Sequence, residues 1–287
     1  MKRCRLSMLA LVGFVIAAIL LLNNNALTHE ETKGTVHVAK ETMEKYKDVI
    51  VQVVLIVKTK VVYQGREIPG GLGKSEDEIE VNGTVVDPSG LTVISNFATD
   101  SSSFLNEQLA GLSGNEEDAP HIKTEQTVTS VKIVTADGKE YPAKLVLRDK
   151  DLDLAFVRPE EKGLNLPCLI LAQAPEPKIL DEVIAISRLD RSCNRQPSVA
   201  IGRIASIVEK PQIRYMLAAA GGDLGCPVFD ASGNVLGISL MRSEINIKSL
   251  LSLRAGALLP MILPCKDIAK AMKQVPANKE EKKEETD

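Results

Sequence analysis

The sequence predicts an all-β protein built from two antiparallel barrels. Short runs of β-branched and other apolar residues recur at regular spacing, and each is bounded by a turn rich in Gly, Pro or Asp. A second series of such runs begins at Glu182. Beyond residue 26, helical patterns are confined to residues 41–47 and 266–275. With 287 residues, the chain is long enough for two β domains.

Residues 1–26 are predicted to be a targeting element. Basic residues at positions 2, 3 and 5 precede an apolar run from Leu6 to Leu22, which is the pattern of an export signal whose basic end stays in the cytoplasm. As a helix this run would be about 25 Å long, the short end of a membrane span. A signal peptide cleaved after Ala26 and an uncleaved membrane anchor over residues 6–22 both fit. Either predicts an extracytoplasmic protein, periplasmic or secreted.

The first predicted barrel covers residues 41–160 and follows a polar stalk at 27–40. The β-branched run Ile50–Val57, apolar except for Gln52, is typical of a buried strand. Residues 65–80 combine Pro, paired Gly and acidic residues, so we expect a loop. The polar stretch at about 101–130 lacks periodicity and is expected to be an exposed insertion. Further strands are expected at 83–86, 91–94, 131–134, 143–147 and 154–157.

The second predicted barrel covers residues 161–276 and closes with a helix. Its strands are expected at 182–186, 199–204, 228–229 and 235–238. Residues 266–275 carry apolar side chains on one side, as an amphipathic helix does. Residues 277–287 mix Lys with Glu and have nothing to bury, so we expect a disordered tail.

Composition and motifs argue against several kinds of partner. The net charge is −3, aromatic residues make up 3% of the chain and tryptophan is absent, which gives no reason to expect nucleic acid. The sequence has no phosphate loop, dinucleotide fingerprint or metal-ligand cluster, so we expect no cofactor and no metal.

Export would permit disulfides. The four cysteines past the leader, Cys168, Cys193, Cys226 and Cys265, could form disulfides in three possible pairings. Alternatively they are buried free thiols.

Four motifs in order resemble trypsin-like serine peptidases of the HtrA/Deg branch. The stretch GGDLGCP at 221–227 resembles the G-[DN]-S-G-G-P nucleophile loop of that family. VDPSGLTVISN at 86–96 resembles its strand-turn-strand before the catalytic histidine. VKIVTADGKEYPAKLV at 131–146 and DKDLDLAFV at 149–157 resemble its hairpin and its aspartate motif. The resemblance covers about residues 41–275. It implies two six-stranded antiparallel barrels of the trypsin-like fold, with a site in the cleft between them.

The resemblance also implies positions for the catalytic residues. The triad aspartate falls on Asp153 and the nucleophile position on Leu224. The histidine position falls on Phe97 when counted from the turn, or on Ala98 when Ser95 is aligned with the threonine of the family. The backbone of the oxyanion loop corresponds to Gly222, Asp223 and Leu224.

The departures from the family pattern predict that no catalytic set is intact. Leu224 has no lone pair or proton to use, and neither Phe97 nor Ala98 can accept a proton. The three histidines lie elsewhere, at His29, His37 and His121. Asp153 then has no histidine to orient, and a turn-capping or ion-paired carboxylate is the better interpretation.

We therefore expect an exported, non-catalytic protease homologue that binds protein or peptide segments, or assembles with other envelope proteins. If the leader stays in place, the N-terminal segment also contacts the membrane. Because only about a dozen residues follow the last helix, we expect no PDZ domain of the kind that many HtrA/Deg members carry. One alternative is a protease with rebuilt chemistry, using Cys226 as nucleophile and His121 as base. The other is a purely structural envelope protein.

Overall fold

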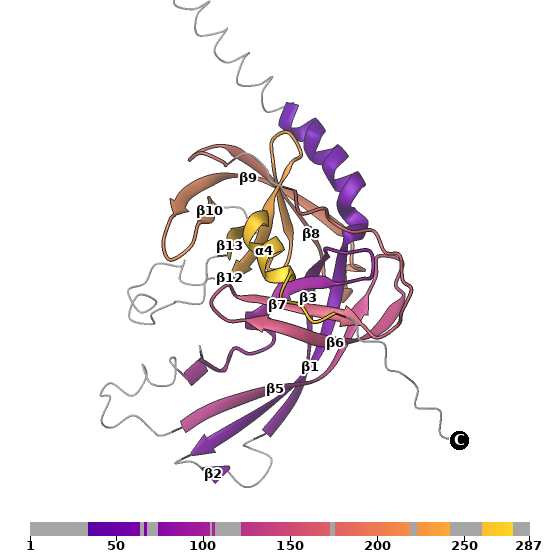
Figure 1. Cartoon of the computed structure of the whole chain (residues 1–287), viewed down its shortest axis with the longest axis vertical. Helices are drawn as coiled ribbons and strands as arrows, with labels where there is room; N and C mark the ends of the chain where they lie inside the picture. Colours follow the sequence, from indigo (N-terminus) through magenta and orange to yellow (C-terminus); the bar gives the residue numbers. More distant parts are fainter. Residues whose placement is uncertain are drawn as a thin grey trace, which may run out of the picture.

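The computed structural model describes residues 34–63, 66–67, 74–103, 105–106, 122–172, 176–218, 223–241 and 260–277. It has two β-barrels along its long axis, with the second barrel above the first in Figure 1. The predicted leader and almost all of the predicted tail lie outside the described residues. Among the helices that are described, none is long and apolar enough to cross a membrane.

The first barrel is a ring of six antiparallel strands in the order β1-β3-β4-β7-β6-β5, closed by pairing of β5 with β1. Its inward-facing side chains are mainly aliphatic, including Val53, Leu55 and Ile133. A short additional strand, β2, pairs with the end of β1. The bounds are β1 (Ile50–Tyr63), β2 (Arg66–Glu67), β3 (Lys74–Val85), β4 (Thr92–Ser95), β5 (Ile122–Val134), β6 (Glu140–Asp149) and β7 (Leu154–Pro159).

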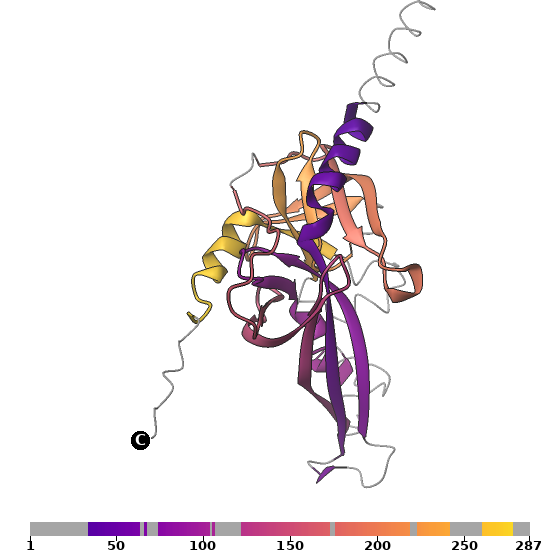
Figure 2. The ribbon, with the colours of Figure 1, turned by 90° about the vertical axis from the view of Figure 1, so that its right-hand side faces the viewer.

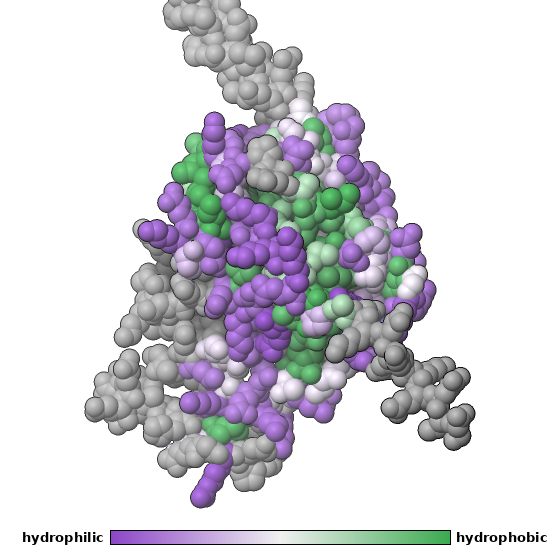
Figure 3. Space-filling model, viewed as in Figure 1, coloured by the Kyte–Doolittle hydropathy of each residue, from purple (hydrophilic) through white to green (hydrophobic). Residues whose placement is uncertain are grey.

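The second barrel is a closed ring in the order β10-β13-β12-β11-β8-β9, with all pairings antiparallel. On its outer side, β9 exposes Val199 and Ile201, and Figure 3 shows hydrophobic surface at the upper left, where Figure 1 places β9 and β10. The bounds are β8 (Glu182–Arg188), β9 (Pro197–Val208), β10 (Arg214–Ala218), β11 (Pro227–Asp230), β12 (Val235–Met241) and β13 (Pro260–Pro264).

A C-terminal helix, α4 (Cys265–Met272), joins the two barrels. Its apolar side, with Ile268 and Ala271, packs on Phe156 of β7 and Ile238 of β12. The predicted fold class is confirmed: two six-stranded antiparallel barrels of the trypsin-like fold with a short C-terminal helix.

Three strands extend past the first barrel as an arm, and two of its segments were wrongly predicted to be loops. The arm combines the ends of β1, β3 and β5, at the lower end of Figure 1. β3 begins at Lys74, inside the predicted loop at 65–80, and β5 begins at Ile122, inside the predicted insertion at 101–130. These segments are largely exposed and polar, so the alternation that marks a half-buried strand is missing.

The predicted stalk at 27–40 was also wrong in part, because residues 34–46 form a helix. Its inner side covers the outer face of β8 and β11, where Val38 and Met43 pack with Ile184 and Ile186. The helix leads into a 3-10 turn, η1 (Lys47–Val49), and then into β1. The stalk composition concealed this helix because only one narrow side is apolar.

Candidate functional site

Asp153 lies immediately before β7, where the two barrels meet, and is 3% exposed. Its Oδ2 accepts hydrogen bonds from Ser95 Oγ at 2.5 Å and from the Met241 backbone N–H at 2.6 Å. Its Oδ1 accepts from the Phe97 backbone N–H at 2.8 Å. Ser95 ends β4 in the first barrel, whereas Met241 ends β12 in the second. The carboxylate therefore connects the two barrels through donors that come from neither an imidazole nor a lysine.

Burial sets the protonation of this carboxyl group. Loss of hydration raises the pKa of Asp153 from 3.8 to about 6, although its three hydrogen bonds and the nearby Arg214 lower it. Asp153 is thus ionised at neutral pH and becomes protonated in mildly acidic solution. Its backbone has a φ of 53°, in the left-handed region, and its carbonyl accepts from the Asn96 N–H at 3.0 Å.

Both candidate histidine positions lie beside Asp153, in the 3-10 helix η3 (Asn96–Ala98). Phe97 is half-buried and contacts Asp153 through its backbone N–H. Ala98 packs against the core of the first barrel. The side chain of Asn96 fixes the turn by accepting from Arg148 Nε at 2.9 Å. Phe97 and Ala98 both have hydrocarbon side chains, which offer no proton acceptor.

The loop that carries Leu224 is held tightly against the first barrel. Gly225 has a φ of 81°, and a Cβ there would lie 2.1 Å from the carbonyl oxygen of Asn82 in β3. Its own carbonyl accepts from Thr84 Oγ1 at 2.6 Å. Leu224 is half-buried and Asp223 is exposed, whereas Gly222 lies outside the described residues. The close approach to β3 requires glycine at this position.

A family model described as a trypsin-like peptidase domain matches residues 82–238, which is more than half of the chain. The chain belongs to the trypsin-like peptidase family. The matched segment includes Asp153, both candidate histidine positions and Leu224.

A comparison with solved structures finds the same fold in an HtrA-type protease. No curated protein matches the chain. Among solved structures, the chain is similar to the HtrA-type protease AlgW, in a serine-to-alanine variant with a tripeptide, at a TM-score of 0.53 and 14% identity. The match covers 84% of this chain and 64% of that chain, so this chain spans less than two thirds of its length. At this identity the similarity establishes the shared fold.

The cysteines of this trypsin-like chain are free thiols at all four positions named above. Cys226, two residues past Leu224, is 1% exposed, and burial raises the pKa of its thiol well above the ordinary value. Burial likewise raises the pKa of Cys265 to about 12. Cys193 is exposed. His121, the proposed partner of Cys226, lies outside the described residues.

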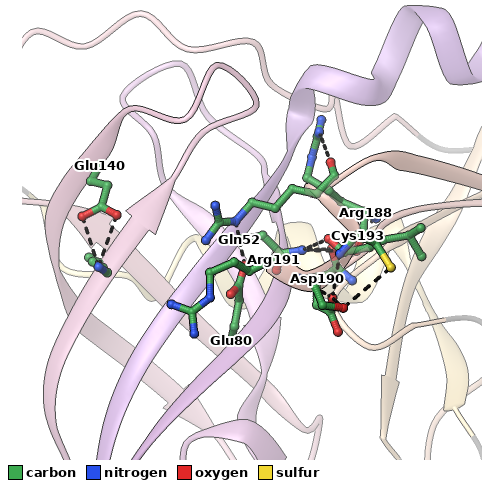
Figure 4. Close-up of polar contacts among 12 residues, drawn as sticks. Gln52, Glu80, Glu140, Arg188, Asp190, Arg191 and Cys193 are labelled. Atoms are coloured by element: carbon green, nitrogen blue, oxygen red, sulfur yellow. Dashed lines mark hydrogen bonds and ion pairs between the residues drawn. The ribbon is translucent and has the colours of Figure 1, made fainter.

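Sequence reasoning missed a second polar junction between the barrels, drawn in Figure 4. Arg188 is buried at the end of β8, and its guanidinium donates to the carbonyls of Ile50 at 3.0 Å, Arg195 at 2.8 Å, and Lys47. Burial lowers the pKa of Arg188. Gln52 of β1 donates to the Arg188 carbonyl at 3.2 Å. A glutamine within the apolar run of β1 was the one sequence signal for this junction.

The described residues contain no group of three or more His, Cys, Asp or Glu side chains that could hold a metal ion. Among the described residues, the polar groups that hydrogen-bond at the candidate site belong to Asp153, Ser95 and the backbone of Phe97 and Met241.

Proposed function

We propose that the chain is an exported, non-catalytic member of the trypsin-like peptidase family that binds protein or peptide segments in the cell envelope. The observation that supports this most is the environment of Asp153. A hydroxyl and two backbone amides surround its carboxylate, and the positions assigned to histidine and serine carry hydrocarbon side chains.

Acyl transfer by this fold requires a nucleophile, a base that takes its proton and a group that orients the base. Asp153 could supply only the third of these roles. Its hydrogen bonds to Met241 and Ser95 instead suit a structural role, because they join β12 of one barrel to β4 of the other. Burying a carboxylate is tolerated when it accepts several hydrogen bonds, as this one does.

The rival hypothesis, a thiol protease using Cys226 and His121, has little support from the geometry of Cys226. A cysteine nucleophile reacts as the thiolate and must be accessible, with a lowered pKa. Cys226 is buried and its pKa is raised. The Cys226 carbonyl also accepts from the Ser239 N–H at 2.8 Å, which fixes this part of the loop.

The proposal is tested by binding of a fluorescently labelled, unfolded polypeptide to the purified protein, measured by anisotropy and followed by electrophoresis of the polypeptide. We expect binding without cleavage, and weaker binding by Leu224→Arg, which places a charge in the loop that carries the nucleophile position. Val199→Arg, on the outer face of β9, is the matched control and should bind as the wild type does. Equal binding by the two variants contradicts binding in the cleft. A protein that binds no polypeptide favours the purely structural alternative.

A further inference from the structure

Two neighbouring aliphatic side chains project from the turn that leads into β8. Ile179 is 58% exposed and Leu180 is 64% exposed, although large aliphatic residues are usually buried. The turn is closed at both ends by Lys178 and Asp181. The Asp181 N–H donates to the Lys178 carbonyl at 3.1 Å, and the Lys178 N–H donates to Asp181 Oδ2 at 2.7 Å. We call residues 178–181 the apolar turn.

The apolar turn is held rigidly on β9. The Leu180 N–H donates to the Ile204 carbonyl at 2.8 Å, and the Leu180 carbonyl accepts from Arg203 Nη1 at 2.9 Å. Leu180 also has a φ of 72°, a conformation in which glycine or asparagine is common and leucine is strained. Neither burial nor backbone preference explains a leucine here. Strained residues of this kind concentrate at binding sites, where the surrounding structure holds them in place.

The apolar turn lies next to the first described residues of the N-terminal helix. Arg203, which binds the turn through Nη1, also donates from Nη2 to Glu182 Oε1 at 2.6 Å. The other oxygen of Glu182 accepts from Thr35 Oγ1 in the helix. The next residue, Val36, is 38% exposed. In Figures 1 and 2, the beginning of this helix is at the end of the molecule opposite the arm of β1, β3 and β5.

The sequence places the apolar run Leu6–Leu22 a short distance before this end of the molecule. Residues 23–33 connect the run to the helix, and these roughly eleven residues span at most about 40 Å when fully extended. If the run lies in a bilayer, the end that carries the apolar turn is therefore the end nearest to the lipid surface. Local charge is balanced there, with Lys178 and Arg203 opposing Asp181 and Glu182, so an anionic surface would not repel the turn.

We propose that the apolar turn is a membrane contact, which inserts Ile179 and Leu180 among the lipid headgroups and orients the barrels on the bilayer. The inference rests on the proposed export of the chain and takes residues 6–22 as an uncleaved anchor. Two aliphatic side chains alone would hold a protein on a bilayer only weakly and reversibly. The anchor keeps the turn at high local concentration beside the lipid, so a weak contact is sufficient to fix the orientation.

The absence of tryptophan from the chain allows a direct test. The full-length protein carrying Ile179→Trp as its single tryptophan is reconstituted in phosphatidylcholine vesicles containing phosphatidylglycerol, with and without brominated acyl chains. We expect a blue shift of the tryptophan emission on reconstitution and a loss of intensity with brominated lipid. Thr127→Trp, exposed on β5 in the arm, is the matched control and should show neither change. Adding Leu180→Gly to Ile179→Trp should reduce the quenching, while the glycine suits the backbone of the turn.

Three results would overturn the membrane contact. One is an unquenched Ile179→Trp in protein that sediments with the vesicles. Another is a blue shift without lipid that grows with protein concentration, which would show contact between two copies of the chain. The third is protein that stays in solution instead of binding the vesicles, which would also contradict the prediction that residues 6–22 are a membrane anchor. Binding of unfolded polypeptide to the cleft is measured separately, so a failure of the membrane contact is distinguishable from a failure of the binding proposal.

Discussion

Replacing Asp153 by asparagine should change the stability of the protein in opposite directions at neutral and acidic pH. The substitution keeps the shape of the side chain but removes its charge, and it replaces one acceptor oxygen by an NH₂ donor. In the folded protein three donors converge on the two oxygens: Ser95, Phe97 and Met241. The hydroxyl of Ser95 can rotate, but at least one backbone N–H must face the new NH₂ group. A buried donor left without an acceptor costs about 1–3 kcal/mol.

The gain from removing the charge depends on pH. Because the pKa of Asp153 rises from 3.8 to about 6 on folding, the folded wild type holds its proton over a range in which the unfolded chain has released it. The stability that this provides is complete below the unfolded pKa and is lost as pH rises through the folded pKa. At about 1.4 kcal/mol per pKa unit the whole shift is worth about 3 kcal/mol, and about 2.4 kcal/mol of it is lost between pH 4 and pH 7, because pH 4 already lies just above the unfolded pKa. Asparagine does not titrate and avoids this loss.

Urea denaturation of the wild type and Asp153→Asn at several pH values between 4 and 7 measures the difference. At pH 4 the variant should be less stable by about 0.5–2.5 kcal/mol, because the hydrogen-bond loss outweighs the small charge effect at that pH. At pH 7 it should equal or exceed the wild type. Stability curves that run parallel from pH 4 to pH 7 would refute the raised pKa. A variant that is most unstable at pH 7 would show that Asp153 is stabilised as the anion.

Three further predictions follow from the barrel junctions and the leader. Gly225→Ala should destabilise the fold by about 2–4 kcal/mol in thermal melts, since its Cβ would meet a backbone carbonyl of β3, whereas Gly138→Ala, at a similar φ with open space around it, should cost only about 1 kcal/mol. Equal losses would contradict the tight packing of the loop. Arg188→Met should cost about 3 kcal/mol in urea denaturation because buried carbonyls lose their donor, and a near-neutral result would show that water replaces it. When cells keep an intact cytoplasmic membrane but their outer layers are permeabilised, added protease should digest the part of the chain after Asn25. Protection of that part would place it in the cytoplasm.

Strands could be predicted from the sequence where burial produces a pattern of apolar residues. Strands without such a pattern could not. The run Ile50–Val57 is apolar except for Gln52 because both faces of that strand are covered, and it was predicted as a strand. The segments 74–80 and 122–130 are strands held mainly by pairing with β1, with polar side chains on both faces, so no periodicity marks them.

The candidate site was predictable only in part, for a related reason. Asp153 stands in a short motif that sequence can find. Its donors include the backbone of Met241, which is 88 positions away and carries no side-chain signal for this contact. The close approach of Gly225 to β3 likewise depends on the docking of two barrels, and local sequence does not encode it.

Hydrolysis of an unfolded protein substrate is the most direct test of whether the site is non-catalytic. The purified protein, Leu224→Ser and Cys226→Ala should all show the same background rate, and none should be labelled by a serine-directed phosphonate. In triad enzymes loss of the nucleophile alone costs about 10⁶ in turnover, and restoring a serine without a base should recover little of it. Turnover that survives rigorous purification and disappears in Cys226→Ala or His121→Ala would contradict the non-catalytic proposal and support the thiol protease.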